Sequence, residues 1–305
     1  MVVSAVRRAV AFAPSHVTGV FSPSVESRDP RGRGSIGAGI VLDVGVRAIG
    51  RFDPEARRGL RLTSDIGRRL EISEAAAIHL FGDRQGRLDI HLLHTLPVGH
   101  GFGSSAAGAL ATAIVVARLL DRPRSAAVQA AHLADYFGRG GLGGVAAILG
   151  GGLEIRVRPG IPPFGRIEHH PLSGTILVGT MGRVLPTPTI LASARVLERI
   201  RRSAGDLSQL AARPTLEEFF RLSESFTDRV HLATPRLQAV IRSLRRRDSS
   251  ACQAMFGESF IAYPRTRAAR RAIVAWLLDH GLAAVELRPA RRGAFAAPGS
   301  IELPV

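Results

Sequence analysis

The N-terminal part of the chain carries apolar stretches whose short period is typical of β-strands. Residues 9–15, 39–52 and 87–96 are rich in aliphatic side chains that partly alternate with polar ones, which predicts three strands. A longer apolar run begins at Ser104 and predicts a helix of about 17 residues that ends at a Pro-containing turn. A second helix is expected over residues 125–138.

Local signals refine the end of this region. Ser125 is expected to cap the second helix, and Gly138 is expected to lie just past its end. A second Gly-rich loop follows, and a strand is expected from Leu153 to Val157. The Pro-rich stretch that comes next marks a boundary near residue 170, which gives predicted domains of residues 1–170 and 171–305.

The C-terminal part has a different pattern, with long amphipathic segments and few strands. The expected elements are a strand at 174–179, helices near 189–203, 215–229, 234–247 and 266–280, and a strand at 282–289. Strands and helices without regular βαβ alternation favour the α+β class over a doubly wound sheet.

Composition bears on whether the chain spans a membrane, carries a signal peptide or forms disulfides. No run of 18 apolar residues lacks charge, so no membrane span is expected. Arg7 and Arg8 lie inside the first apolar run rather than ahead of it, which argues against a signal peptide. Cys252 is the single cysteine and forms no internal disulfide, so a cytoplasmic location is expected.

The net charge of +16 raises the question of nucleic acid. All 41 basic residues are arginine, because the chain contains no lysine. They are scattered over helical segments such as 194–203, where solvated helix faces are the ordinary interpretation. A nucleic-acid partner is therefore not expected, although an RNA-binding protein stays an alternative, with an affinity that falls steeply with salt.

The absence of lysine also excludes several kinds of nucleotide chemistry. P-loop NTPases and protein kinases use a lysine on the phosphates, and Schiff-base enzymes use a lysine amine. A nucleotide bound by this chain must be held by backbone amides, hydroxyls, arginine and a metal ion.

A Gly-rich loop runs directly into the helix predicted from Ser104. Gly99, Gly101 and Gly103 permit positive φ and close backbone approach, and Ser104 and Ser105 place two hydroxyls at the helix start. The first amides of a helix lack intrahelical partners and favour an anion. The alternative interpretation is a tight turn followed by a serine helix cap.

Residues 97–107, Pro-Val-Gly-His-Gly-Phe-Gly-Ser-Ser-Ala-Ala, resemble the phosphate-binding motif of the GHMP kinases, which include galactose, homoserine and mevalonate kinases. The resemblance implies a two-domain α+β fold, with an N-terminal domain like ribosomal protein S5 domain 2 and a ferredoxin-like C-terminal domain. It also implies that ATP is bound, with Mg²⁺. The implied nucleotide-binding residues are Pro97, Gly99, Gly101, Gly103, Ser104, Ser105 and Ala106.

Further stretches are similar to the archaeal pantoate kinases, which phosphorylate the 4-hydroxyl of pantoate on the route to coenzyme A. The similar stretches are residues 13–23, 29–46, 131–147 and 151–165, with a weaker match at 252–262. A pantoate kinase that forms 4-phosphopantoate is thus implied. Another GHMP kinase, of mevalonate or homoserine type, stays an alternative.

The resemblance also implies residue roles. The Ser105 hydroxyl would lie near the β/γ-phosphates and Mg²⁺, and Asp135 stands where the family usually has a glutamate metal ligand. The implied substrate contacts are His16, Ser35, His132 and Arg156. Alternatively, Asp135 is a solvated helix carboxylate and His132 a core histidine.

One position departs from the family pattern. The family usually reads Thr-Gly-Leu-Gly-Asp-Val, with a catalytic aspartate, whereas here Gly144 stands at the aspartate position and Gly140 at the threonine position. Three interpretations stay open: a working kinase with another arrangement, a slow kinase, and a paralogue that binds ligand without turnover. A homodimer is expected only from the frequency of such assemblies.

Overall fold

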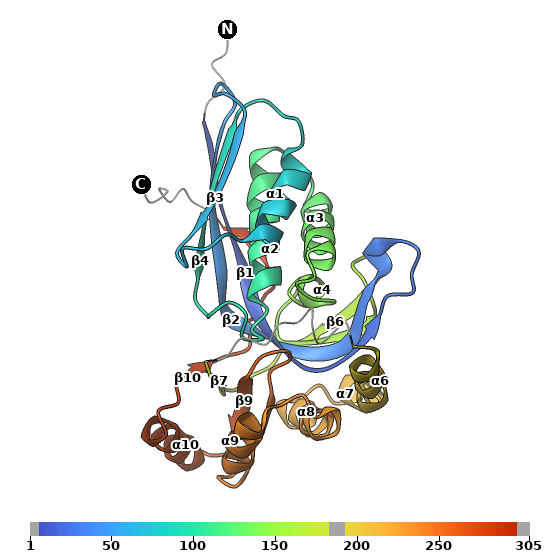
Figure 1. The fold of residues 1–305 in the computed structure, drawn as a ribbon, viewed down its shortest axis with the longest axis vertical. Helices are drawn as coiled ribbons and strands as arrows, with labels where there is room; N and C mark the ends of the chain where they lie inside the picture. Colours follow the sequence, from blue (N-terminus) through green and yellow to red (C-terminus); the bar gives the residue numbers. More distant parts are fainter. Residues whose placement is uncertain (1–5, 183–192, 298–305) are drawn as a thin grey trace.

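The computed structural model describes residues 6–182 and 193–297, and these residues form two β-sheets with helices packed on each (Figure 1). The larger sheet has the order β11-β1-β2-β4-β3, and β5 and β6 extend it from the far end of β2. Its strands are β1 (Arg7–Ser24), β2 (Gly34–Asp53), β3 (Gly59–Ser64), β4 (Arg87–His94), β5 (Leu153–Arg158), β6 (Arg166–His170) and β11 (Phe295–Ala297).

Four helices cover one face of the larger sheet (Figure 1). They are α1 (Glu71–Phe81), α2 (Ser104–Leu119), α3 (Arg124–Phe137) and the single turn α4 (Gly144–Ala147). Nearly every residue of α2 is buried, because α2 lies against the sheet and is flanked by α1 and α3. This explains why its sequence is apolar all round rather than along one stripe.

Strands β1 and β2 form a long antiparallel ribbon, joined through the 3₁₀ turn η1 (Pro30–Gly32). One end of β2 pairs with β4, and the other end pairs with β5. The register of the ribbon shifts between Pro14 and His16 and again between Thr18 and Val20. Such irregularities bend a strand and change the direction of a side chain, so His16 is placed by the first shift.

The smaller sheet has the order β10-β7-β9-β8 and lies below the larger sheet in the view of Figure 1. Its elements are β7 (Ile176–Thr180), α6 (Ala194–Ser203), α7 (Ser208–Ala212), α8 (Leu216–Val230), α9 (Pro235–Arg245), β8 (Ser249–Gln253), β9 (Ser259–Pro264), α10 (Arg267–Asp279) and β10 (Ala284–Leu287). Helix α8 packs against β1, where Phe226 meets Phe21 with ring centroids 5.9 Å apart.

The α+β class predicted from the sequence is confirmed. The predicted boundary after residue 170 coincides with the end of β6, and the division into two domains there stays a prediction. Strand β11 lies beyond that boundary in the sequence but pairs with β1 in the larger sheet. No helix of residues 6–182 and 193–297 is long and apolar enough to cross a membrane.

Several local predictions need correction. Ser125 does not cap α3, because the helix begins one residue earlier and its N-cap is Pro123, which offers no side-chain hydrogen bond. Gly138 is the C-cap, as expected. The predicted helix at 189–203 corresponds to α6, which Ser193 caps through its hydroxyl, while residues 189–192 lie outside the described residues. The sequence patterns had indicated none of α1, β3, β6, α7, β8, β9 or β11.

Candidate active site

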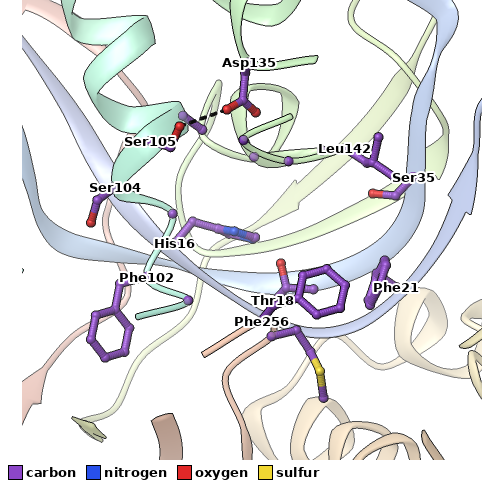
Figure 2. Close-up of a pocket in the computed structure, with 18 of the residues that line it drawn as sticks. His16, Thr18, Phe21, Ser35, Phe102, Ser104, Ser105, Asp135, Leu142 and Phe256 are labelled. Carbon is purple, nitrogen blue, oxygen red and sulfur yellow. Dashed lines mark hydrogen bonds between the residues drawn. The ribbon is translucent and has the colours of Figure 1, made fainter. Parts of the chain in front are cut away.

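A cavity of about 840 Å³, part of it open to solvent, lies where the start of α2 faces the β1–β2 ribbon (Figure 2). Its walls come from β1, β2 and β5, the loop after β4, the loop before α4, and the segment between β8 and β9. The lining residues are His16, Thr18, Phe21, Ser35, Gly99, Gly101–Ala106, Asp135, Gly140–Gly144, Arg156, Met255 and Phe256.

The Gly-rich loop has the backbone needed to hold an anion. Gly99, Gly101 and Gly103 have φ of 91°, 80° and 67°, in the left-handed region that side chains rarely adopt. Gly103 is the N-cap of α2, and no side chain caps the helix. The first amides of a 16-residue helix therefore face the cavity without a side-chain acceptor, which is the arrangement that binds phosphate.

Two other residues of the predicted nucleotide site are placed differently. The Ser104 hydroxyl is directed back to the Pro97 carbonyl oxygen at 3.5 Å, a weak contact at most. Pro97 itself is not among the residues that line the cavity. Ala106 lines it as part of the first turn of α2.

Ser105, which is half-buried, and Asp135, which is buried, form an oxygen pair at the top of the cavity in Figure 2. The Ser105 hydroxyl donates to Asp135 Oδ1 at 3.2 Å. Burial raises the pKa of Asp135 to about 6, and the hydrogen bond from Ser105 opposes this rise. Asp135 is only 3% exposed, so the solvated carboxylate considered from the sequence is not what the structure shows.

A glycine keeps the space beside this pair open. A β-carbon at Gly140 would lie 2.2 Å from Asp135 Oδ1 and 2.7 Å from Ser105 Oγ, so any larger residue would fill it. Hydroxyl and carboxylate oxygens are ligands that Mg²⁺ accepts, and Mg²⁺ usually completes its shell with waters and substrate phosphates. The residues therefore fit Mg²⁺, although the described residues contain no cluster of three or more His, Cys, Asp or Glu side chains for a metal.

A buried ionic cluster lies at the opposite wall. Glu154 Oε1 accepts hydrogen bonds from His16 Nε2, at 2.8 Å, and from the Arg156 guanidinium. All three side chains are at most 3% exposed. Burial lowers the pKa of His16 despite its contact with Glu154, which favours the neutral imidazole. Glu154 Oε2 and Arg156 Nε have no hydrogen-bond partner among the described residues.

The unpartnered Arg156 Nε lies close to the Ser35 hydroxyl. A β-carbon at Gly143 would lie 2.6 Å from Ser35 Oγ and 2.9 Å from Arg156 Nε. The absence of a side chain at Gly143 thus lets the Ser35 hydroxyl and the Arg156 guanidinium approach each other closely at the wall of the cavity, which both residues line. An arginine and a hydroxyl arranged in this way suit a carboxylate.

Of the four predicted substrate contacts, three lie in the cavity wall and one lies outside it. His16, Ser35 and Arg156 line the cavity, whereas His132 does not. The His132 ring stacks on Tyr136, and its Nε2 lies 3.1 Å from the Pro30 carbonyl oxygen. This position fits the alternative of a structural histidine, which here holds η1 against α3.

Gly144 begins α4 and lines the cavity without a carboxylate. A β-carbon at Gly144 would lie 2.7 Å from the Ala106 Cβ, so α4 packs more closely on α2 than a side chain there permits. Among the described lining residues, only His16 and Asp135 carry a group that can take up a proton near neutral pH.

The sequence reasoning missed Glu154 and the apolar residues of the far wall, among them Phe21 and Phe256. Glu154 and Arg156 are two residues apart on one strand, so they share a face. These two charged residues on one face of a predicted strand were the available signal, and the pairing that buries them could be seen only in the structure.

Comparison with known proteins places the chain among small-molecule kinases. The model of the GHMP kinases N terminal domain matches residues 71–152. A pantoate kinase of Methanospirillum hungatei is 30% identical over 255 residues, which cover 82% of this chain and 85% of that protein. A pantoate kinase of Thermococcus kodakarensis is 28% identical over 272 residues, 86% of this chain and 89% of that protein.

Solved structures share the fold. A phosphotransferase related to the coenzyme A biosynthesis pathway superimposes with a TM-score of 0.84 at 24% identity, covering 95% of this chain and 99% of that one. MDDEF, solved in complex with MVAPP, AMPPCP and magnesium, superimposes with a TM-score of 0.71 at 12% identity, covering 96% and 99%.

Proposed function

Because this chain belongs to the GHMP kinase superfamily, we propose that it is a pantoate kinase, which transfers the γ-phosphoryl group of ATP to the 4-hydroxyl of pantoate. The observation that carries the substrate assignment is the unpartnered Arg156 Nε beside the Ser35 hydroxyl, in the same cavity as the Gly-rich loop. A substrate with both a carboxylate and a hydroxyl is required to use both parts of this cavity.

The loop and the start of α2 would hold the phosphates of ATP. Backbone amides supply the donors, so the missing lysine is no obstacle to binding. GHMP kinases use ATP and Mg²⁺, and Ser105 and Asp135 would hold the ion here. When bound, Mg²⁺ neutralises charge that develops on the transferred phosphoryl group.

Arg156 and Ser35 would bind the pantoate carboxylate and thereby fix the position of the hydroxyl that reacts. Glu154 holds the Arg156 guanidinium in place by accepting from it, and the strand pairing of β5 with β2 and β6 fixes both residues. Orientation of this kind is a large part of catalysis in phosphoryl transfer, which needs little covalent chemistry from the protein.

Gly144 favours a second candidate, a paralogue that binds ATP or pantoate without turnover. The family aspartate is absent, and a general base typically contributes about 10²–10⁴-fold to a rate. A different GHMP substrate, such as mevalonate or homoserine, is the third candidate. The cytoplasmic location and the homodimer stay predictions.

Single-turnover ATP consumption tests the proposal, with pantoate, mevalonate and homoserine compared at saturating Mg²⁺. Of the three acceptors, we expect only pantoate to support turnover. Its rate should fall roughly 10- to 100-fold in Ser105→Ala through loss of a charge-assisted contact. Ser64→Ala, whose hydroxyl bonds to a turn outside the cavity, is the matched control. Turnover with another acceptor would replace the substrate, and binding without turnover would establish the paralogue.

A further inference from the structure

Transfer of a phosphoryl group to an alcohol requires that the hydroxyl lose its proton, and at position 144 no carboxylate is present to take it. The cavity offers two other proton acceptors among its described lining residues, His16 and Asp135. Asp135 already accepts from Ser105 and belongs to the proposed metal site. His16 is therefore the remaining acceptor in the cavity.

The hydrogen bonding of His16 fixes which ring nitrogen is free. Nε2 lies 2.8 Å from Glu154 Oε1, and a carboxylate oxygen that also accepts from Arg156 can only accept here. Nε2 thus carries the proton, and Nδ1 carries a lone pair. Nδ1 has no hydrogen-bond partner within the described residues, and it is not among their fully enclosed polar atoms that lack one. It therefore opens onto the cavity that His16 lines.

His16 also lies between the two parts of the cavity. On one side, its backbone N–H donates to the Phe102 carbonyl at 3.0 Å, and a β-carbon at Gly103 would lie 3.2 Å from the His16 Cβ. On the other side, His16 shares a carboxylate oxygen with Arg156. Figure 2 shows the imidazole extending into the space between Ser105 and Thr18.

We propose that His16 is the general base of the reaction and that Glu154 is the residue that positions it. This inference rests on the proposed function. The substrate hydroxyl oxygen bonds to the γ-phosphorus while the bond from that phosphorus to the bridging oxygen of ADP breaks. The hydroxyl proton passes to His16 Nδ1, and Glu154 stabilises the imidazolium until the proton leaves to solvent after product release.

The charges around His16 suit this role. Glu154 and Arg156 face it from β5 with opposite signs, and His169 of β6 faces the same carboxylate. Burial is the largest influence and lowers the pKa of His16, which favours the neutral form that a base needs. An Asp-His or Glu-His pair of this kind fixes the tautomer and orientation of the ring in other enzymes.

His16→Gln tests the proposal, because a glutamine amide can donate to Glu154 but cannot accept a proton. We expect kcat to fall about 10²–10⁴-fold while the KM for pantoate changes little. The ionisation assigned to His16 should vanish from the pH–rate profile of this variant. His169→Gln is the matched control, since His169 faces the same carboxylate but does not line the cavity.

Two further measurements guard against a merely structural effect. In His16→Ala, added imidazole should restore part of kcat, whereas it should not activate the wild type. Glu154→Asp should lower kcat and shift the pH–rate profile without abolishing binding of an ATP analogue. A wild-type kinase whose His16→Gln variant keeps its kcat and its pH profile refutes the base alone. A wild-type protein that phosphorylates no pantoate refutes the proposed function, and the proposed base with it.

Discussion

The space beside the Ser105–Asp135 pair can be closed by a single methyl group. Gly140→Ala would place a β-carbon 2.2 Å from Asp135 Oδ1 and 2.6 Å from the Cδ1 of Ile72. Gly141→Ala is the control, because its β-carbon would meet only Asp135 Oδ2, at an ordinary 3.4 Å. Neither glycine has φ in the left-handed region, so the backbone accepts alanine at both positions.

The expected size of the effect follows from the overlap. Inserting a methylene into a packed site typically costs about 1–3 kcal/mol. Asp135 makes the closest of these contacts and Ser105 Oγ lies 2.7 Å away, so both members of the pair are among the groups that must move. If that cost falls on the metal site, the half-saturating Mg²⁺ concentration rises roughly 5- to 140-fold, at 1.4 kcal/mol per factor of ten.

The assay is the initial rate of ATP-dependent pantoate phosphorylation as a function of Mg²⁺ concentration, with thermal melting of each variant alongside. Gly141→Ala should follow the wild-type curve. Gly140→Ala should need more Mg²⁺ and should melt at a lower temperature. Equal Mg²⁺ curves for the two alanine variants would show that the space at Gly140 is not used by the ion or its ligands. That result would refute the predicted Mg²⁺ requirement.

Three further outcomes are expected. Since the pKa of Asp135 rises from 3.8 to about 6 on folding, the metal-free native state binds more protons than the unfolded state between these values, so stability falls as pH rises from 4 to 6. Asp135→Asn should remove this loss and, by urea unfolding at pH 7.5, stabilise the protein by up to about 3 kcal/mol while abolishing Mg²⁺-dependent turnover. Arg156→Gln should raise the KM for pantoate roughly 10- to 100-fold but leave the KM for pantoate amide unchanged, and equal effects on both would contradict a carboxylate site. Gly144→Asp should destabilise the protein by about 1–3 kcal/mol and so lower its melting temperature, because its β-carbon meets the Ala106 Cβ. Ala106→Gly should relieve that clash, and a melting temperature unaffected by Gly144→Asp would contradict it.

The elements that could be predicted from the sequence are those with a strong local signal. Helix α2 is apolar along its whole length and follows a Gly-rich loop, and α6 and α8 have hydroxyl caps at Ser193 and Thr215. Helix α1 was missed because its N-cap, Leu70, carries no capping side chain. Strand β8 was missed because it is wholly buried yet consists largely of serine and glutamine, which break the apolar pattern of a core strand.

The candidate site likewise contains residues that could be predicted from the sequence and one, Glu154, that could not. The residues of the Gly-rich loop and Asp135 follow a motif with fixed spacing, so the sequence located them. Glu154 follows no motif, and a glutamate in a strand normally faces solvent. Only the pairing of β5 with β2 and β6 encloses it beside His16, which lies far away in the sequence. Long-range pairing of this kind is outside the reach of periodicity.

The return of β11 to the larger sheet bears on how the chain is made. Val10 pairs with Ala297 and Phe12 with Phe295, so β1 is synthesised long before the strand that covers this part of its edge. On the ribosome, this part of the edge of β1 stays open until β11 has emerged. A nascent chain that stops before Phe295 therefore keeps a free strand edge, which can pair with another chain and lead to aggregation. The larger sheet is therefore completed only after the strands of the smaller sheet have been synthesised.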